Sequence, residues 1–292
     1  MQRIQTRAEL AAALKEAPRP LGFVPTMGAL HEGHAALIRA ARAECATVVV
    51  SVFVNPTQFA EATDLASYPR TLEVDATLAE RCGADILFHP SDAEVYPPDE
   101  VVPSVDPGPL ALRLEGAARP GHFAGVATVV SRLFDLVLPD RAYFGEKDAQ
   151  QLRVVEWITA RRSSTQRSSA PRVDIRRVPT VRDHDGLALS SRNARLTAAG
   201  RSAATAIPRA LDAAVDMCAR GDNSVAELRA AVERVLRESP SLAIDYVDLA
   251  DPMTLEPLPE HVAVKEALLT IAVIVDGVRL LDERLLGVRR EG

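Results

Sequence analysis

The sequence has few cysteines and no long apolar run. Its 292 residues include three scattered cysteines, Cys45, Cys82 and Cys218, and no Cys-x-x-Cys pair. That pattern argues against a disulfide framework or a structural zinc site and suits a reducing cytoplasm. No run reaches the roughly 20 apolar residues of a membrane-spanning helix, and polar residues rather than an apolar signal core follow Met1. We therefore expect a soluble, cytoplasmic protein with no membrane partner.

Positive charge is also scarce. Lys and Arg total 34 against 40 Asp and Glu, a formal net charge of −6, and the only lysines are Lys15, Lys147 and Lys265. The whole chain therefore offers no basic surface for nucleic acid, and we expect no nucleic-acid partner. An apolar content of 47% and a charged content of 25% are typical of a globular protein whose length allows two domains.

A glycine-bearing turn with two histidines follows the first clear strand pattern. The run from Pro25 to His34 reads Pro-Thr-Met-Gly-Ala-Leu-His-Glu-Gly-His and comes directly after the apolar residues 21–24. This order predicts a strand, a turn and then a helix. Ligands bind at the carboxyl ends of strands in open parallel α/β sheets, and the amino terminus of a helix attracts anions.

The two histidines of this turn are candidates for phosphate binding. His31 and His34 lie one helical turn apart, so both imidazoles can face one anion, as hydrogen-bond donors and as charged imidazolium groups. Gly28 and Gly33 would let a ligand approach the backbone closely. The alternative is that each histidine caps the helix or is simply solvated.

Two further turns carry polar groups at strand ends. Residues 47–54 are almost wholly β-branched or aromatic, which predicts a parallel strand buried on both faces, and Gln58 lies in the Asn-Pro turn that follows it. Lys147 lies in a Gly-Glu-Lys-Asp turn after the apolar residues 142–144. A lysine at a helix start opposes the macrodipole, so this position favours a bound anion, with an ion pair to a neighbouring acid as the alternative. The chain has neither a GxxxxGK[ST] nor a GxGxxG loop.

The last polar run is Leu-Ser-Ser-Arg-Asn at residues 189–193, which follows a glycine turn. Its hydroxyl groups and its arginine can bind phosphates, and they can equally cap a helix that starts near Thr197.

Residues 161–172 are rich in Ser and Arg and predict a polar surface loop.

The strand and helix patterns predict two domains. Residues 1–185 are expected to form a Rossmann-like, doubly wound parallel α/β sheet. Residues 186–292 are expected to form a smaller α+β domain. Its predicted elements are helices near 197–219 and 223–237, and strands at 243–249 and 268–275 before an Asp-Gly hairpin turn.

Together these motifs resemble the pantoate–β-alanine ligase family. The His-x-Gly-His run at 31–34 is shared by a superfamily of nucleotidylyltransferases. Four further motifs match the family in order and rough spacing: Phe53 to Phe59, Tyr68-Pro69-Arg70, Phe144 to Asp148 with Gln150-Gln151, and Leu189 to Asn193. Together with the His-x-Gly-His run they make five motifs, and this combination is specific. The resemblance covers essentially the whole chain. Two departures are Leu189, where some relatives have Met, and a longer Ser/Arg-rich segment 161–172.

The resemblance implies an ATP-dependent ligase that joins pantoate to β-alanine. Pantoate and ATP would first give pantoyl adenylate and pyrophosphate, and the amine of β-alanine would then release AMP. Mg²⁺ is implied with ATP, and so are a homodimer and the closure of the 186–292 domain over the ATP site. The other readings are a different His-x-Gly-His nucleotidylyltransferase or adenylate-forming ligase, including one like class I aminoacyl-tRNA synthetases, and a nucleotide-binding regulator on the same fold. The charge of −6 and the absence of a lysine near Ser190 and Ser191 argue against a tRNA ligase.

The resemblance also assigns roles to residues. It implies three catalytic residues: His34, the usual proton donor, together with His31 and Lys147. Gln58 and Gln151 would bind pantoate, and Gln58 would also lie near β-alanine. The implied ATP site comprises Met27, Gly28, Ala29, Leu30, His31, Glu32, Gly33, His34, Gly145, Glu146, Lys147, Asp148, Val181, Leu189, Ser190, Ser191 and Arg192. Candidates of second rank are Asn55, Tyr68, Glu115 and Arg119. The metal ligands are unassigned, with Asp75 and Asp148 as the carboxylates to consider.

Overall fold

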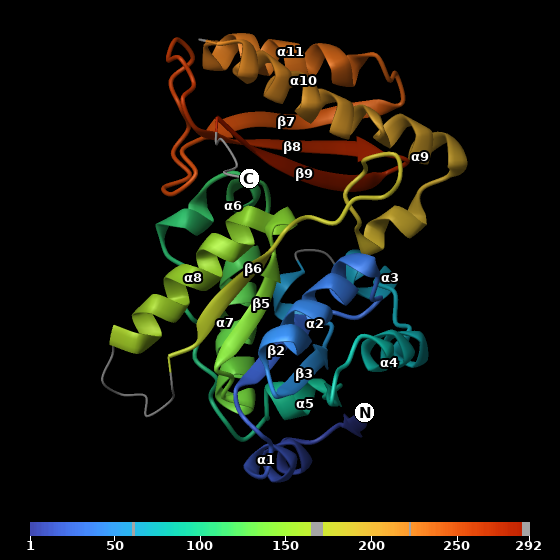
Figure 1. Cartoon of the computed structure of the whole chain (residues 1–292), viewed down its shortest axis with the longest axis vertical. Coiled ribbons are helices and arrows are strands. Elements are labelled where there is room, and N and C mark those ends of the chain that lie inside the picture. The colour runs from blue at the N-terminus through green and yellow to red at the C-terminus, as the bar shows by residue number, and fades with distance from the viewer. Residues whose placement is uncertain (60–61, 165–171, 222, 288–292) are drawn as a thin grey trace. The chain divides into compact units, whose positions relative to one another are not determined.

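Two units make up the chain in the computed structural model, Met1–Pro179 and Thr180–Gly292 (Figure 1). The structure describes residues 1–59, 62–164, 172–221 and 223–287. The sequence-based boundary, after residue 185, falls a few residues later than the observed division. Each unit has its own core: two buried clusters in the first and one in the second.

A six-stranded parallel sheet forms the centre of the first unit. Its strand order is β1-β4-β3-β2-β5-β6. The strands are β1 Gln2–Ile4, β2 Leu21–Thr26, β3 Thr47–Val52, β4 Ile86–Phe88, β5 Arg141–Gly145 and β6 Asp174–Val178. The predicted doubly wound parallel sheet is therefore confirmed. The sequence analysis missed β1, which has only three residues and shows no strand periodicity.

The chain reverses its direction across the sheet between β2 and β5. From β2 it passes to β3 and β4 on one side, and β5 then pairs with β2 on the other side, with Gly22 opposite Arg141. At such a switch point the turns that follow the two strands diverge and leave a crevice at the carboxyl ends. The turns after β2 and β5 are those that carry the histidines and Lys147.

Helices cover both faces of this sheet. Val24 and Val50 point to one face and pack with helices α2 (Glu32–Glu44) and α4 (Leu72–Arg81), whereas Phe23 and Val49 point to the other. This alternation follows the pleat of the strands. The second face is covered by α1 Arg7–Lys15, α7 His122–Val137 and α8 Ala149–Ser164. Shorter elements are α3 Ala62–Ser67, α5 Asp92–Val95, α6 Glu115–Ala118, and the 3-10 turns η1 Pro56–Gln58, η2 Pro109–Leu112 and η3 Glu146–Asp148.

The end of α8 differs from the sequence analysis. Residues 161–164, expected in a polar loop, continue the helix to Ser164. Arginine and serine are tolerated in a helix whose earlier residues pack on the core, so the composition of this stretch concealed its structure. The rest of that predicted loop, residues 165–171, lies outside the described residues.

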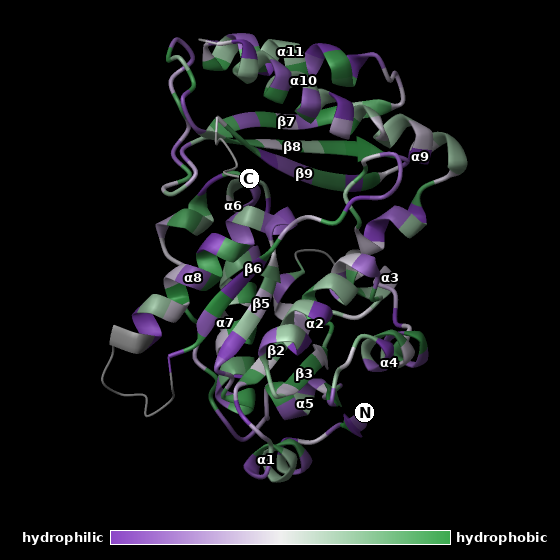
Figure 2. Ribbon diagram, viewed as in Figure 1, coloured by the Kyte–Doolittle hydropathy of each residue, from purple (hydrophilic) through white to green (hydrophobic). Residues whose placement is uncertain are grey.

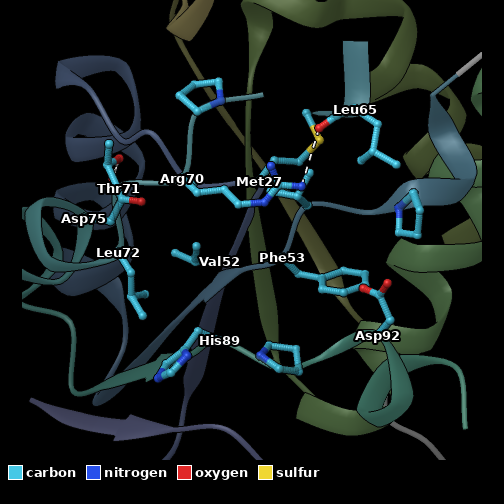
Figure 3. A pocket seen from close by; sticks show the side chains of 15 residues that line it. Met27, Val52, Phe53, Leu65, Arg70, Thr71, Leu72, Asp75, His89 and Asp92 are labelled. Atoms are coloured by element: carbon cyan, nitrogen blue, oxygen red, sulfur yellow. Dashed lines mark hydrogen bonds between the residues drawn. The ribbon is translucent and has the colours of Figure 1, made fainter. Parts of the chain in front are cut away.

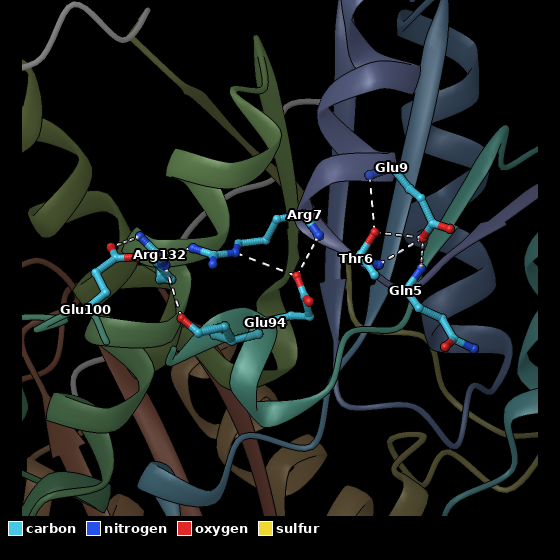
Figure 4. Close-up of polar contacts among 8 residues, drawn as sticks. Gln5, Thr6, Arg7, Glu9, Glu94, Glu100 and Arg132 are labelled. Atoms are coloured by element: carbon cyan, nitrogen blue, oxygen red, sulfur yellow. Dashed lines mark hydrogen bonds and ion pairs between the residues drawn. The ribbon is translucent and has the colours of Figure 1, made fainter. Parts of the chain in front are cut away.

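Thr6 caps the start of α1 (Figure 4). Thr6 Oγ1 accepts the backbone N–H of Glu9 at 3.2 Å, and a Glu9 carboxylate oxygen accepts that of Thr6 at 3.1 Å. Beside it, the Arg7 guanidinium lies 3.6 Å from a Glu94 oxygen and 3.1 Å from a Glu100 oxygen. Exposed ion pairs of this kind contribute only about 0–1 kcal/mol each, so the sheet core carries most of the stability.

The second unit is an antiparallel sheet with helices. Strands β7 Leu242–Ala250, β8 Ala267–Val275 and β9 Val278–Leu286 pair in that order, with positive φ at Asp276 and Gly277 in the predicted hairpin turn. The helices are α9 Ala198–Ala204, α10 Ala206–Arg220 and α11 Val225–Arg237, and η4 Ser191–Arg195 precedes them. The small α+β domain is confirmed. The helix expected over 197–219 is broken at Thr205, because Pro208 cannot donate to the carbonyl of Ala204.

The helices of the second unit are amphipathic. In α11, Leu228, Val232 and Leu236 are fully buried at a spacing of four residues, and Figure 2 shows hydrophobic and hydrophilic residues mixed along α10 and α11. This periodicity is why they were predictable from sequence. No helix among the described residues combines the length and the apolar character needed to cross a bilayer.

The two faces of β8 allow a matched test of the second core. Ile271 is fully buried, whereas Ile274 on the same strand is 41% exposed. Ile271→Ala leaves a cavity and is expected to lower the free energy of unfolding by about 2–5 kcal/mol. Ile274→Ala is expected to change it by about 0.5 kcal/mol or less. Chemical denaturation followed by circular dichroism measures both, and equal losses would contradict the assigned core.

Candidate active site

The turn between β2 and α2 has an unusual backbone. Gly28 has φ +83° and Ala29 has φ +50°, so two successive residues are left-handed. A Cβ on Gly28 would lie 3.0 Å from Asp75 Oδ2 and 3.0 Å from Val52 Cγ1. Glycine is therefore required both for its conformation and for lack of space.

The backbone N–H groups of this turn are bonded to the protein itself. Gly28 donates to Thr26 Oγ1 at 3.1 Å, and Ala29 and Leu30 donate to the two oxygens of Asp75 at 3.0 and 2.8 Å. The Asp75 carboxylate and Thr26 thus accept these N–H groups, and the close approach of a ligand at Gly28 stays a prediction. The sequence analysis considered Asp75 only as a metal ligand. Asp75 shares one face of α4 with Ala76 and Ala79, which are buried, and this spacing was the signal in the sequence that its carboxylate points into the protein.

The two histidines form a reciprocal cap at the start of α2. Nδ1 of His31 accepts the N–H of Gly33 at 3.1 Å, and Nδ1 of His34 accepts the N–H of His31 at 3.2 Å. Since Nδ1 is an acceptor in both rings, each neutral imidazole has its proton on Nε2. The ring centroids lie 4.1 Å apart. The capping alternative is thus correct, and it leaves one N–H donor on each ring for a ligand.

Burial keeps both imidazoles neutral. Desolvation, with the charge of Lys147, lowers the pKa of His31 from 6.5 to about 4. Desolvation, followed by the effect of His31, lowers the pKa of His34 to about 3. The charged imidazolium groups expected from the sequence are therefore absent at neutral pH in the ligand-free protein. The rings act as neutral hydrogen-bond donors.

Lys147 supplies the positive charge at this place. It lies in η3 after β5, its side chain is 19% exposed, and its Nζ is 3.4 Å from Asp148 Oδ1. Strands β2 and β5 are neighbours in the sheet, so the turns that follow them lie beside each other, and the charge of Lys147 lowers the pKa of both His31 and His34. The predicted ion pair with Asp148 is present, and the predicted cation at the switch point is present as well.

Gln58 is held next to the same turn. It is 8% exposed, and its Nε2 lies 2.9 Å from Met27 Sδ. Asn55 Nδ2 donates to its Oε1 at 3.1 Å, and His122 Nδ1 lies 2.9 Å from its backbone oxygen. The sequence analysis gave Asn55 second rank and did not consider His122, whose distance of 64 positions along the chain conceals the contact. The Gln58 side chain is thus fixed by two contacts.

The adjacent glutamines of α8 have different surroundings. Gln150 is 5% exposed and bonds to the Glu115 N–H and to the carbonyls of Leu110 and Arg113, so it holds the loop before α6. In the described part of the chain, the side chain of Gln151 has no hydrogen-bond partner, so its amide is available to a ligand. Among the second-rank candidates, Glu115 is buried and lies 4.0 Å from Arg119.

The remaining candidates belong to the second unit. Leu189 donates its N–H to the Val181 carbonyl at 3.0 Å, which joins those two residues. Ser190 Oγ accepts the Arg192 N–H at 3.3 Å and caps η4, which also contains Ser191. The helix near Thr197 is capped by Thr197 itself. The alternative that this run caps the helix near Thr197 was therefore wrong, and Ser190 caps η4 instead.

A pocket of about 420 Å³ opens beside the β2 turn, at the carboxyl ends of β2, β3 and β4 (Figure 3). Of the residues considered from the sequence for catalysis or binding, Met27, Gly28 and Asp75 line it, whereas the histidines, Lys147 and Gln58 do not. The pocket thus adjoins the histidine turn without containing its polar groups. No group of three or more His, Cys, Asp or Glu residues suited to a metal occurs within residues 1–59, 62–164, 172–221 and 223–287.

Comparison with known proteins gives consistent matches. The family model for pantoate–β-alanine ligase matches residues 1–285. A pantothenate synthetase of Chloroflexus aurantiacus is 48% identical over 286 residues, 98% of each chain. The crystal structure of pantothenate synthetase from Thermus thermophilus has a TM-score of 0.88 at 46% identity and covers 97% of this chain and 99% of that one. A pantoate–β-alanine ligase from Francisella tularensis, complexed with beta-gamma ATP and β-alanine, has a TM-score of 0.77 at 31% identity and covers 98% of this chain and 97% of that one.

The buried histidines predict a pH-dependent stability. Their pKa is lower in the folded state than the unfolded value of 6.5, so unfolding takes up protons below that pH. The neutral histidines should make their full contribution to stability above pH 6.5, and the free energy of unfolding should fall as the pH is lowered from there toward 4. His34→Asn should reduce this fall between about pH 7 and pH 4.5, as measured by denaturant titration.

The control is His261→Asn, at an exposed histidine of the second unit. In this variant the free energy of unfolding is expected to fall between about pH 7 and pH 4.5 by as much as it does in the parent protein. The same pH dependence in His34→Asn as in the parent would contradict a neutral, buried imidazole at position 34.

Proposed function

The chain belongs to the pantoate–β-alanine ligase family and is thus an enzyme that joins pantoate and β-alanine with ATP; we propose that it does so through pantoyl adenylate. In the first step a carboxylate oxygen of pantoate attacks the α-phosphorus of ATP, and the bond to pyrophosphate breaks. In the second step the amine of β-alanine attacks the acyl carbon. An amide bond forms, the acyl–phosphate bond breaks, AMP leaves, and the amine gives up its proton.

The observation that carries this proposal is the pair of neutral imidazoles beside Lys147 at the switch point of the sheet. Adenylation needs no protein nucleophile; it needs two anions held in line and the developing charge stabilised. The Nε2–H groups of His31 and His34 are fixed donors for phosphate oxygens, and Lys147 adds charge. With a pKa of about 3, His34 suits hydrogen-bond donation to the phosphate better than transfer of its own proton from an imidazolium.

Pantoate binding is proposed for Gln58 and Gln151. An amide side chain can donate to a carboxylate and accept from a hydroxyl group, which are the polar groups of pantoate. Asn55 fixes the orientation of Gln58, and the amide of Gln151 has no partner within the described residues. Gln58 is also proposed to lie near β-alanine in the second step.

ATP binding is proposed for residues of both units. They are Met27 to His34, Gly145 to Asp148, Val181 and Leu189 to Arg192. Mg²⁺ would arrive with the nucleotide, since it keeps several waters and binds largely through phosphates. Of the two carboxylates considered from the sequence, Asp148 is 48% exposed beside Lys147 and fits such an ion, whereas Asp75 is occupied by backbone donors. A cytoplasmic location and a homodimer belong to the same proposal.

The proposal is tested by product release from ATP and Mg²⁺. Without β-alanine, pantoate should cause the release of about one pyrophosphate per enzyme molecule, because the adenylate stays bound. Addition of β-alanine should give AMP and continued turnover. Folded enzyme that releases no pantoate-dependent pyrophosphate would contradict the proposal, and other acids would then be tried at the same nucleotide site.

The scarcity of lysine provides a matched pair of variants. Lys147→Ala is expected to lower the rate of pyrophosphate release by about 10²–10³-fold, because it removes a charge preorganised for the transition state. Lys15→Ala, at the exposed end of α1, is expected to change that rate by less than about two-fold. Stopped-flow measurement of pyrophosphate compares them, and equal rates in the two variants would remove Lys147 from the mechanism.

A further inference from the structure

A buried carboxylate organises the histidine turn. Asp75 lies near the amino end of α4 and is 1% exposed. Its Oδ2 accepts the Ala29 N–H at 3.0 Å, and its Oδ1 accepts the Leu30 N–H at 2.8 Å and the Thr71 hydroxyl at 3.1 Å. Figure 3 shows Thr71 and Asp75 next to each other at one side of the pocket. Helix α4 is therefore bonded directly to the turn after β2.

The N–H groups of this turn surround a negative charge. Gly28 and Ala29 both have positive φ, and the N–H groups of Ala29 and Leu30 both donate to the Asp75 carboxylate, as successive N–H groups of a turn can around an anion. Alanine rarely adopts this conformation and keeps it only where the surroundings enforce it. The carboxylate of Asp75 satisfies both N–H groups at once. A neutral side chain with a single acceptor would leave one of them unpaired.

The direction of the imidazoles depends on this turn. Leu30 is bonded to Asp75 and is followed directly by His31, whose N–H is bonded to the His34 ring and whose own ring caps α2. A rotation of the Ala29–Leu30 backbone would therefore change the place of both rings. A carboxylate offers about four lone-pair positions. Three are used here, which favours an organising role for Asp75 over a metal-binding one.

We propose that Asp75 is a positioning residue whose carboxylate holds the 28–30 backbone so that His31 and His34 present their Nε2–H groups to the nucleotide. The effect on activity that this proposal predicts rests on the proposed function. The predicted effects on the histidine rings and on the backbone of the turn do not, so a failure of this proposal can be distinguished from a failure of the proposed function.

The first measurement compares Asp75→Asn with Asp140→Asn. Asp140 is a matched control, because its carboxylate also accepts a backbone N–H of β2, that of Leu21 at 2.6 Å, but at the opposite end of the strand. Asp75→Asn should lower kcat/KM for pyrophosphate release by about 100-fold, as expected for misplaced catalytic groups. Asp140→Asn should stay within about three-fold of the parent, even where its melting temperature falls.

The second measurement follows the ring resonances of His31 and His34 with pH in each folded variant. In Asp75→Asn the rings gain access to water, and their titration midpoints should rise toward the ordinary value. In Asp140→Asn they should match the parent. A purely structural role for Asp75 would lower stability without moving these midpoints. Folded Asp75→Asn with parental activity and parental ring titration would overturn the proposal.

A third measurement needs no variant and covers the case in which Asp75→Asn does not fold. Hydrogen exchange of the Ala29 and Leu30 amides in the parent protein should be slow, although both lie in a turn, because both are bonded to a buried carboxylate. Exchange at the rate of free amides would overturn the proposal. A parent enzyme without pantoate-dependent pyrophosphate release would contradict the proposed function, while the exchange and ring data would still decide the role of Asp75.

Discussion

The candidate site depends on one arrangement of hydrogen bonds, in which backbone N–H groups donate to Nδ1 of two histidines. This arrangement fixes the tautomer of His31 and of His34, holds both rings in place, and leaves Nε2–H of each ring outside these bonds. The amino terminus of α2 thereby presents imidazole donors instead of bare amides. Because the rings are buried and neutral, nearby charge comes from Lys147. Hydrogen-bond geometry and electrostatic attraction are thus supplied by different residues.

The sheet topology brings these contributions together. Strand β2 carries the histidines, β5 carries Lys147, and β3 leads to Gln58; the three strands are neighbours in the sheet. Parallel strands end at the same edge, so turns that are far apart in sequence meet there. The contacts that fix the turns come from other elements: Asp75 from α4 holds the backbone after β2, and Asn55 holds Gln58. The side chains that make these supporting contacts are buried.

Much of the fold could be predicted from the sequence. The β-branched run of β3, the amphipathic α11 and the Asp-Gly hairpin each have a local cause that is visible in the residues. The three-residue β1 and the helical residues 161–164 were missed, because pairing and packing at a distance decide them. Of the site, the turns and their polar side chains were predictable. The neutral state of the imidazoles and the contact of Asp75 with the turn were not, since both depend on burial by residues far away in sequence.

The site requires both imidazoles to be neutral Nε2–H donors. The most direct test is the ¹⁵N chemical shift of the ring nitrogens of His31 and His34 in the full chain, recorded from about pH 7 down to about pH 5. The expected result is an unprotonated Nδ1 and a protonated Nε2 in both rings throughout that range. Protonation of either ring with a midpoint near the ordinary value of about 6.5, or a proton on Nδ1 of either ring, would contradict it.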